Sequence, residues 1–194
     1  TAPEGITTIP SLNLVAIASE EDARDDKIRS SIAIFKLFEE SSTPFYPTLT
    51  SQSRDDGSPI PFAALSGLAA GVHPHLLYTI EDSFYNKNRI LTIDTKVTPA
   101  EIVKEQRIMD TGSVLAECLT GTLGDGVELS DIINDDKTVN IDPEGISVSA
   151  SGGFVIASEG SGTVGDEDKP YKIPNFLIKT DDDAVITSCI LLPE

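Results

Sequence analysis

Short apolar runs separated by polar turns follow one another along the whole chain, and this pattern predicts β-strands. Residues 30–37 and 88–94 alternate polar and apolar side chains with a period of two, which is typical of half-buried strands. Residues 12–18 and 154–157 are apolar without interruption, as in strands that are buried on both faces. Further strands are expected within 101–109, 175–180 and 185–192. The pattern therefore predicts an all-β protein.

Three segments repeat one plan. The first and third begin with Pro-Glu-Gly-Ile, at residues 3–6 and 143–146, and each continues through an apolar strand to a glutamate, Glu20 or Glu159. The middle copy is degenerate, with Leu-Ser-Gly-Leu at 65–68, and it reaches Glu81 after nearly the same spacing. A repeat of about four short antiparallel strands is the sequence sign of a β-propeller blade.

The expected fold is a single domain over 1–194, a partial β-propeller of about three four-stranded antiparallel blades. The blades would span about 1–60, 61–112 and 141–194, and residues 113–140 would be an insertion. A second insertion is expected within 39–60, and both could form short helices or loops, with Ser113 and Asp125 as helix-cap signals.

An open set of three blades leaves sheet edges and inner strands uncovered, which favours aggregation. We therefore expect a partner that completes the ring, either the rest of the propeller or a second copy of the chain.

The Pro-Glu-Gly-Ile motif has a physical explanation at the centre of a ring. Proline fixes φ on entry to the inner strand, and glycine permits a close approach of neighbouring backbones. The glutamates between them, Glu4 and Glu144, would lie at the mouth of the central channel. They either accept backbone N–H groups in a turn or belong to a ring of carboxylates that binds a hard cation such as calcium.

Acidic residues also end the second strand of each repeat, where a hairpin would bring them to the start of the first strand. Crowded carboxylates raise one another's pKa values unless a cation neutralises them. Asp142 precedes the third motif and could add a ligand or cap the turn. Solvated loop acids are the alternative interpretation. The candidate metal ligands are Glu4, Glu20, Glu81, Asp82, Glu144 and Glu159.

Other chemistry finds little support in the sequence. His73 and His75 flank a proline without a third ligand nearby, which favours a β-turn over a zinc site. The chain has no EF-hand loop, no G-x-S-x-G elbow and no phosphate-binding glycine loop before a helix. No catalytic or substrate-binding residue can be assigned.

The amino-acid composition excludes some classes of binding partner. The 194 residues include 32 acidic and 14 basic side chains, for a net charge of −18. Nucleic acids and anionic membrane surfaces both require a basic face, so neither is an expected partner. No apolar run is long enough for a transmembrane helix, so membrane insertion is not expected. Cys118 and Cys189 can form at most one bridge, and the sequence leaves their pairing open.

Several segments together resemble the phytase-like β-propeller family, whose members are often described as having esterase-like activity. The resemblance covers about Leu65 to Glu194, which looks like the first half of that domain, and it rests on the segments 65–68, 77–82, 89–94, 141–146, 153–160 and 191–193. It implies a secreted or periplasmic propeller, with calcium-dependent hydrolysis of phosphoric esters. In that family, calcium ions held by channel carboxylates bind substrate phosphates and activate a water molecule.

Two functional hypotheses follow from these observations. The first is a calcium-binding segment of an extracytoplasmic phytase-like propeller that hydrolyses a phosphorylated small molecule, for which a protein of charge −18 needs bridging cations. The second is a non-catalytic propeller that serves as a binding or structural module of a larger secreted protein.

Overall fold

The computed structural model describes residues 3–19, 30–37 and 48–193, and these residues form three sheets in chain order. The first sheet is antiparallel and has the order β1-β2-β3. Its strands are β1 (Pro3–Ile9), β2 (Leu14–Ser19) and β3 (Ser31–Lys36), and the 3₁₀ turn η1 (Pro10–Leu12) joins the first two.

The second sheet has the order β4-β8-β7-β6-β5, and the third has the order β12-β11-β10-β9. The strands of the second sheet are β4 (Leu49–Ser51), β5 (Leu65–Ala70), β6 (Leu76–Glu81), β7 (Arg89–Asp94) and β8 (Ala100–Arg107). Those of the third are β9 (Pro143–Val148), β10 (Phe154–Ser158), β11 (Phe176–Thr180) and β12 (Ile186–Leu191).

The all-β prediction is confirmed, and the four-stranded antiparallel unit is found intact in the third sheet. The other two sheets differ from it. The first has three described strands, and the second gains β4, which pairs parallel to β8 at the sheet edge. This strand lies inside the segment 39–60 that the sequence suggested as a loop or helix; residues 39–47 of that segment lie outside the described residues.

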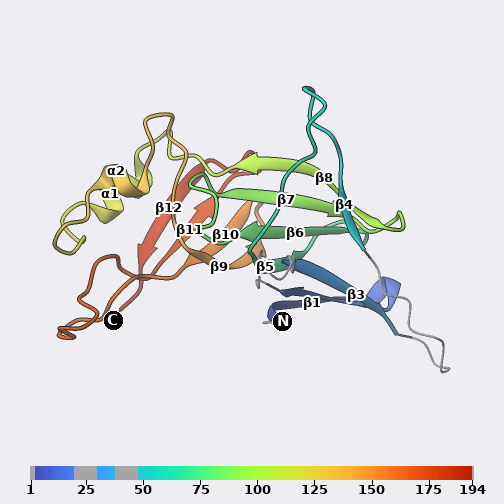
Figure 1. Ribbon diagram of the computed structural model, residues 1–194, viewed down its shortest axis with the longest axis horizontal. Coiled ribbons are helices and arrows are strands. Elements are labelled where there is room, and N and C mark those ends of the chain that lie inside the picture. The colour runs from blue at the N-terminus through green and yellow to red at the C-terminus, as the bar shows by residue number, and fades with distance from the viewer. Residues whose placement is uncertain (1–2, 20–29, 38–47, 194) are drawn as a thin grey trace.

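The strand that begins with the repeat motif, called the first strand of each repeat, lies against the corresponding strand of the next sheet, β1 against β5 and β5 against β9. Figure 1 shows the resulting order, with the blue, green and orange-red sheets following one another across the molecule. One apolar core fills the space between the first two sheets, and a second core fills the space between the last two sheets and the helices. The sheets do not close into a ring among the described residues.

Glycines of the repeat make this close packing of first strands possible. A Cβ atom on Gly5 would lie 3.1 Å from the Ser66 carbonyl oxygen, and one on Gly67 would lie 3.1 Å from the Ile146 amide nitrogen. A side chain at either position would therefore press on the backbone of the next sheet. This agrees with the role that the sequence assigned to glycine in the Pro-Glu-Gly-Ile motif.

The insertion after β8 forms two short helices, α1 (Val114–Leu119) and α2 (Leu129–Ile132). Ser113 occupies the N-cap position of α1 but forms no side-chain cap bond. Asp110 does so instead, accepting hydrogen bonds from the amides of residues 115 and 116 at 3.0 Å. Glu128, not Asp125, caps α2. Residue type alone predicted the helices but not the residues that cap them.

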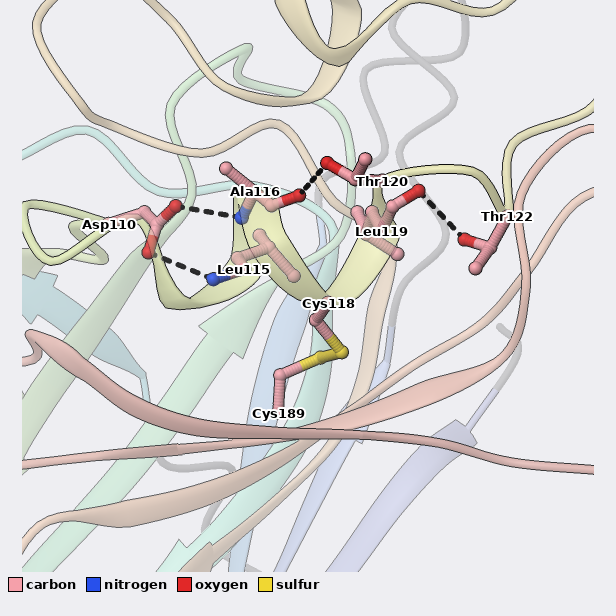
Figure 2. Close-up of a disulfide and its surroundings, with 8 residues drawn as sticks. All are labelled: Asp110, Leu115, Ala116, Cys118, Leu119, Thr120, Thr122 and Cys189. Atoms are coloured by element: carbon pink, nitrogen blue, oxygen red, sulfur yellow. Dashed lines mark hydrogen bonds between the residues drawn. A yellow bond between two sulfur atoms is a disulfide. The ribbon is translucent and has the colours of Figure 1, made fainter.

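A disulfide between Cys118 and Cys189 ties α1 to β12, as Figure 2 shows. The sequence left this pairing open. The bridge joins residues 71 positions apart, so it encloses nearly the whole third sheet in one covalent loop. Such a bridge is compatible with an extracellular protein. In the described part of the chain, no helix is long and apolar enough to cross a membrane.

Candidate metal centre

A β-bulge recurs at the same place in every sheet. The pairing of β1 with β2 skips Glu4, that of β5 with β6 skips Ser66, and that of β9 with β10 skips Glu144. The skipped residue is the second residue of each repeat motif. A bulge leaves one residue unpaired and turns its side chain away from the regular alternation. In the second and third sheets the two side chains meet, and the Ser66 hydroxyl donates a 2.7 Å hydrogen bond to Glu144 Oε2.

Three carboxylates converge beside this contact. Asp82 follows the last residue of β6, Asp142 precedes β9, and Glu144 is the bulged residue of β9. One oxygen from each lies within 4.8 Å of the other two, and all three side chains are partly buried. This acidic triad could hold a metal ion. Two different sheets supply it, so its geometry depends on how the second and third sheets pack together.

The electrostatics of the triad oppose its full ionisation. Burial, reinforced by the neighbouring carboxylates and foremost by Asp82, raises the pKa of Asp142 to about 7. Burial also raises the pKa of Glu144, although the hydrogen bond from Ser66 acts in the opposite direction. Asp142 Oδ1 is buried and has no hydrogen-bond partner among the described residues. A cation between these groups would relieve the repulsion and satisfy that oxygen.

The candidate ligands from the sequence lie in different places. Asp82 and Glu144 belong to the triad. Glu4 and Glu159 are exposed, and their charges contribute to the raised pKa of Glu144. Glu20 lies outside the described residues. Whether any of these residues binds a metal stays a prediction.

Glu81 is engaged elsewhere. Its carboxylate is fully buried, and it accepts hydrogen bonds from Arg89 Nε at 2.9 Å and from Arg89 Nη2 at 2.7 Å. The amide of Ala63 donates to it as well, at 3.3 Å. Burial still raises the pKa of Glu81 to about 7, against the effect of the guanidinium. Arg89 also forms an ion pair with Glu105, and Glu105 forms a second ion pair with Arg54. These ion pairs therefore stabilise the second sheet itself.

The sequence suggested Asp142 only as an additional ligand or a turn cap, outside the main ligand set, and it did not identify Ser66 as a partner of the site. Both residues could have been found by comparing equivalent positions in the three repeat copies. Ser66 occupies the bulge position at which the other two copies carry glutamate. Asp142 precedes the motif proline, and its carbonyl oxygen accepts the Glu159 amide at 2.8 Å, which extends the ladder beyond the strand.

A cavity of about 170 Å³ adjoins the triad at Asp142. Apolar side chains of Ile132, Ile141, Ile173 and Phe176 line it, together with uncharged polar residues and Glu159. No lysine or arginine is among its described lining residues. The cavity therefore suits an uncharged organic group, and it offers no side-chain cation for a phosphate.

His73 and His75 lie in the turn between β5 and β6, where the Leu76 amide donates to the His73 carbonyl oxygen at 2.9 Å. The turn interpretation from the sequence is confirmed. In the described part of the chain, the only group of three or more metal-ligating side chains is the acidic triad.

The fold and the site together define an all-β protein of repeated sheets with an acidic cluster that could hold a metal ion. Residues 60–194 match the model of the Phytase-like family, described as "Esterase-like activity of phytase". The match spans well over half of the chain, and the chain belongs to this family. Comparisons with curated proteins and with solved structures gave no significant match. The three triad residues all lie inside the matched segment.

Proposed function

We propose that the chain holds a calcium ion at the acidic triad and forms part of an extracytoplasmic phytase-like propeller that hydrolyses phosphoric esters. The observation that carries this proposal is the convergence of Asp82, Asp142 and Glu144 from two sheets at a partly buried point. Burial and the neighbouring carboxylates raise the pKa values of Asp142 and Glu144, so a bound cation would favour their ionised forms at neutral pH.

The donor set fits calcium by its chemistry. It consists of carboxylate oxygens, which hard cations prefer, and it includes no sulfur or imidazole. Calcium tolerates irregular coordination more readily than magnesium does, and here the ligands come from a strand end, a turn and a bulge. When bound, the ion would neutralise charge at a phosphoryl oxygen and lower the pKa of a coordinated water.

The proposed ligand set also includes Glu4 and Glu159, because the charges of both raise the pKa of Glu144. Glu20 remains in the set by its position in the repeat. We leave Glu81 out of it, because Arg89 and the Ala63 amide already occupy its oxygens.

The cavity beside Asp142 supports an ester substrate. A phosphoryl group near the triad would place the organic part of the ester in this cavity, against the side chains of Ile141 and Phe176. Because the lining supplies no cation, the phosphate would depend on the metal for its binding energy.

The propeller architecture and the location are part of the same proposal. The successive packing of first strands and the bulge in every sheet support blades arranged around one axis. The disulfide supports an oxidising compartment, either secreted or periplasmic.

The metal claim is tested by calorimetric titration of calcium into the whole chain, with Asp142→Asn and Glu144→Gln as variants. The matched control is Asp135→Asn, at an exposed acid outside the triad. We expect one binding event for the unmodified chain and the control, and at least a tenfold loss of affinity in each triad variant. Equal binding in all four proteins would mean that calcium binds elsewhere, and absence of binding would remove the metal claim.

The catalytic claim is tested separately, by phosphate release from p-nitrophenyl phosphate and from phytate with calcium or with a chelator. We expect hydrolysis that requires calcium and disappears in Glu144→Gln. The second candidate function is a non-catalytic binding module, favoured by the lack of a basic side chain among the described residues that line the cavity. Calcium binding without hydrolysis of either ester would support this module.

A further inference from the structure

The second sheet has one face toward the first sheet and one toward the third. On the second sheet, Leu68 and Leu91 belong to the core shared with the first sheet, whereas Ile80 and Ile90 belong to the core shared with the third. The motif glycines Gly5 and Gly67 lie on the face toward the following sheet, as the contacts of Gly67 with Ile146 show. We call the face that carries the motif glycine the glycine face of each sheet. The opposite face carries the next motif residue, Ile6, Leu68 or Ile146, and we call it the isoleucine face.

The register places equivalent residues on these faces in all three sheets. The glycine face carries one row of directly paired residues per sheet: Gly5, Ala18 and Ile32; Gly67, Ile80 and Ile90; Gly145, Ala157, Leu177 and Ile190. The isoleucine face carries Ile6, Ile17 and Ala33 in the first sheet and Leu68, Thr79 and Leu91 in the second.

Two of these faces have no sheet against them among the described residues. Leu68 is 7% exposed because the first sheet covers it, but its equivalent Ile6 is 68% exposed. At the other end of the molecule, Ile190 is 59% exposed on the glycine face of the third sheet. Figure 1 shows these two sheets on opposite sides of the central one.

The glycine of the third sheet has the same uncovered surroundings. A Cβ atom on Gly5 or Gly67 would meet the backbone of the next sheet at 3.1 Å. One on Gly145 would meet only the Ala157 side chain, at 3.6 Å, within the described part of the chain. The position that admits a neighbouring backbone is thus present in the third sheet, and the neighbouring backbone is not.

We propose that the glycine face of the third sheet docks on the isoleucine face of the first sheet in a second copy of this chain. The contact would repeat those of β1 with β5 and of β5 with β9, so it continues a packing that the molecule already uses twice. In place of Leu68 or Ile146, Ile6 of the second copy would approach Gly145. The two faces differ, so the association is head-to-tail, and two chains close a ring when each donates both faces.

The net charge of −18 opposes this association and makes it depend on salt. The apolar rows themselves carry no charged side chain: Ile6, Ile17 and Ala33 face Gly145, Ala157, Leu177 and Ile190. The repulsion therefore acts at longer range, and ions screen it.

The test is sedimentation equilibrium of the whole chain at micromolar to tens of micromolar concentration, at low and at high salt. We expect a species of twice the 20.7 kDa chain mass, with tighter association at high salt. Ile6→Asp, Ile190→Asp and Gly145→Val should each be monomeric. Val72→Asp is the control, because Val72 is another well-exposed apolar residue, in the turn after β5, and lies on neither face. It should remain dimeric.

Mixing the variants tests the head-to-tail geometry. Ile6→Asp retains the glycine face and Ile190→Asp retains the isoleucine face, so an equimolar mixture keeps one intact contact and should form a heterodimer. Circular dichroism and thermal melting establish that each variant is folded. A monomeric unmodified chain at every salt concentration, or a mixture that stays monomeric while the unmodified chain dimerises, would overturn the proposal.

Discussion

Removing the disulfide is the perturbation whose effect can be worked out most directly. The double variant Cys118→Ser with Cys189→Ser opens a loop that spans 71 positions of sequence. In the chain-entropy description, a loop of this length stabilises the folded state by about 4 kcal/mol, because it limits the unfolded ensemble. Dividing this free energy by the unfolding entropy expected for a single cooperative unit of 194 residues gives a fall in Tm on the order of 10 °C.

The folded structure should survive this change. Leu115 and Leu119 of α1 are fully buried in the core between the second and third sheets, so packing holds the helix in place without the bridge. Asp110 retains its hydrogen bonds to the first turn of α1, as seen in Figure 2. The bridge therefore acts mainly on the unfolded chain.

The assay is urea unfolding followed by circular dichroism, with and without a reductant. The reductant should lower the stability of the unmodified chain to that of the double variant and should leave the variant unchanged. A loss below about 1 kcal/mol, or a native far-UV spectrum that disappears in the variant before any urea is added, would refute the reasoning.

Three further predictions concern the triad, the buried ion pair and the repeat glycines. Because the folded-state pKa of Asp142 is raised to about 7, its contribution favours folding at low pH and is lost as pH rises from about 4 through 7; with a chelator present, melting curves of Asp142→Asn should depend less on pH than those of the unmodified chain. Arg89→Met leaves Glu81 buried without its partner and should cost about 3–5 kcal/mol in urea unfolding, and adding Glu81→Leu should recover much of that loss; no recovery would contradict the assignment of the cost to an unpaired charge. Gly67→Val presses on Ile146 and Ile80 and should cost about 1–3 kcal/mol, whereas Gly145→Val should cost under about 1 kcal/mol in the monomer, measured at a concentration too low for association; equal losses in such thermal melts would contradict the difference in packing.

The sequence predicted the strands well because the signals are local, either an alternation with a period of two or an uninterrupted apolar run. Residues 30–37 alternate in the sequence, and the structure has β3 at Ser31–Lys36. The repeat motif predicted the close approach of first strands, because glycine has few other reasons to recur at that place. Strand β4 escaped the prediction, because three residues are too few to show a period and their partner, β8, lies far along the chain.

The site was only partly predictable for a related reason. Hairpin pairing within one repeat predicted that Glu159 lies near the start of β9, close to Glu144; in the structure the Glu159 amide donates to the carbonyl oxygen of Asp142, two residues before Glu144. The contact of Asp82 with Asp142 and Glu144, however, crosses from one sheet to another. It depends on how two sheets pack, and no local pattern carries that information. Glu81 likewise pairs with Arg89 because of the direction in which its side chain points, and the sequence pattern does not contain that direction.

The unpaired residue at the bulge of each sheet is not needed for the pairing of the strands. Glu4, Ser66 and Glu144 contribute no rung to the pairing of their strands, so exchanging one for another leaves the neighbouring rungs in register. Each repeat therefore has one position, at the same end of its sheet, at which the side chain can differ while the strand pairing stays the same. A single substitution at one of these positions can therefore change the charge at that end of a sheet without changing the pairing of its strands.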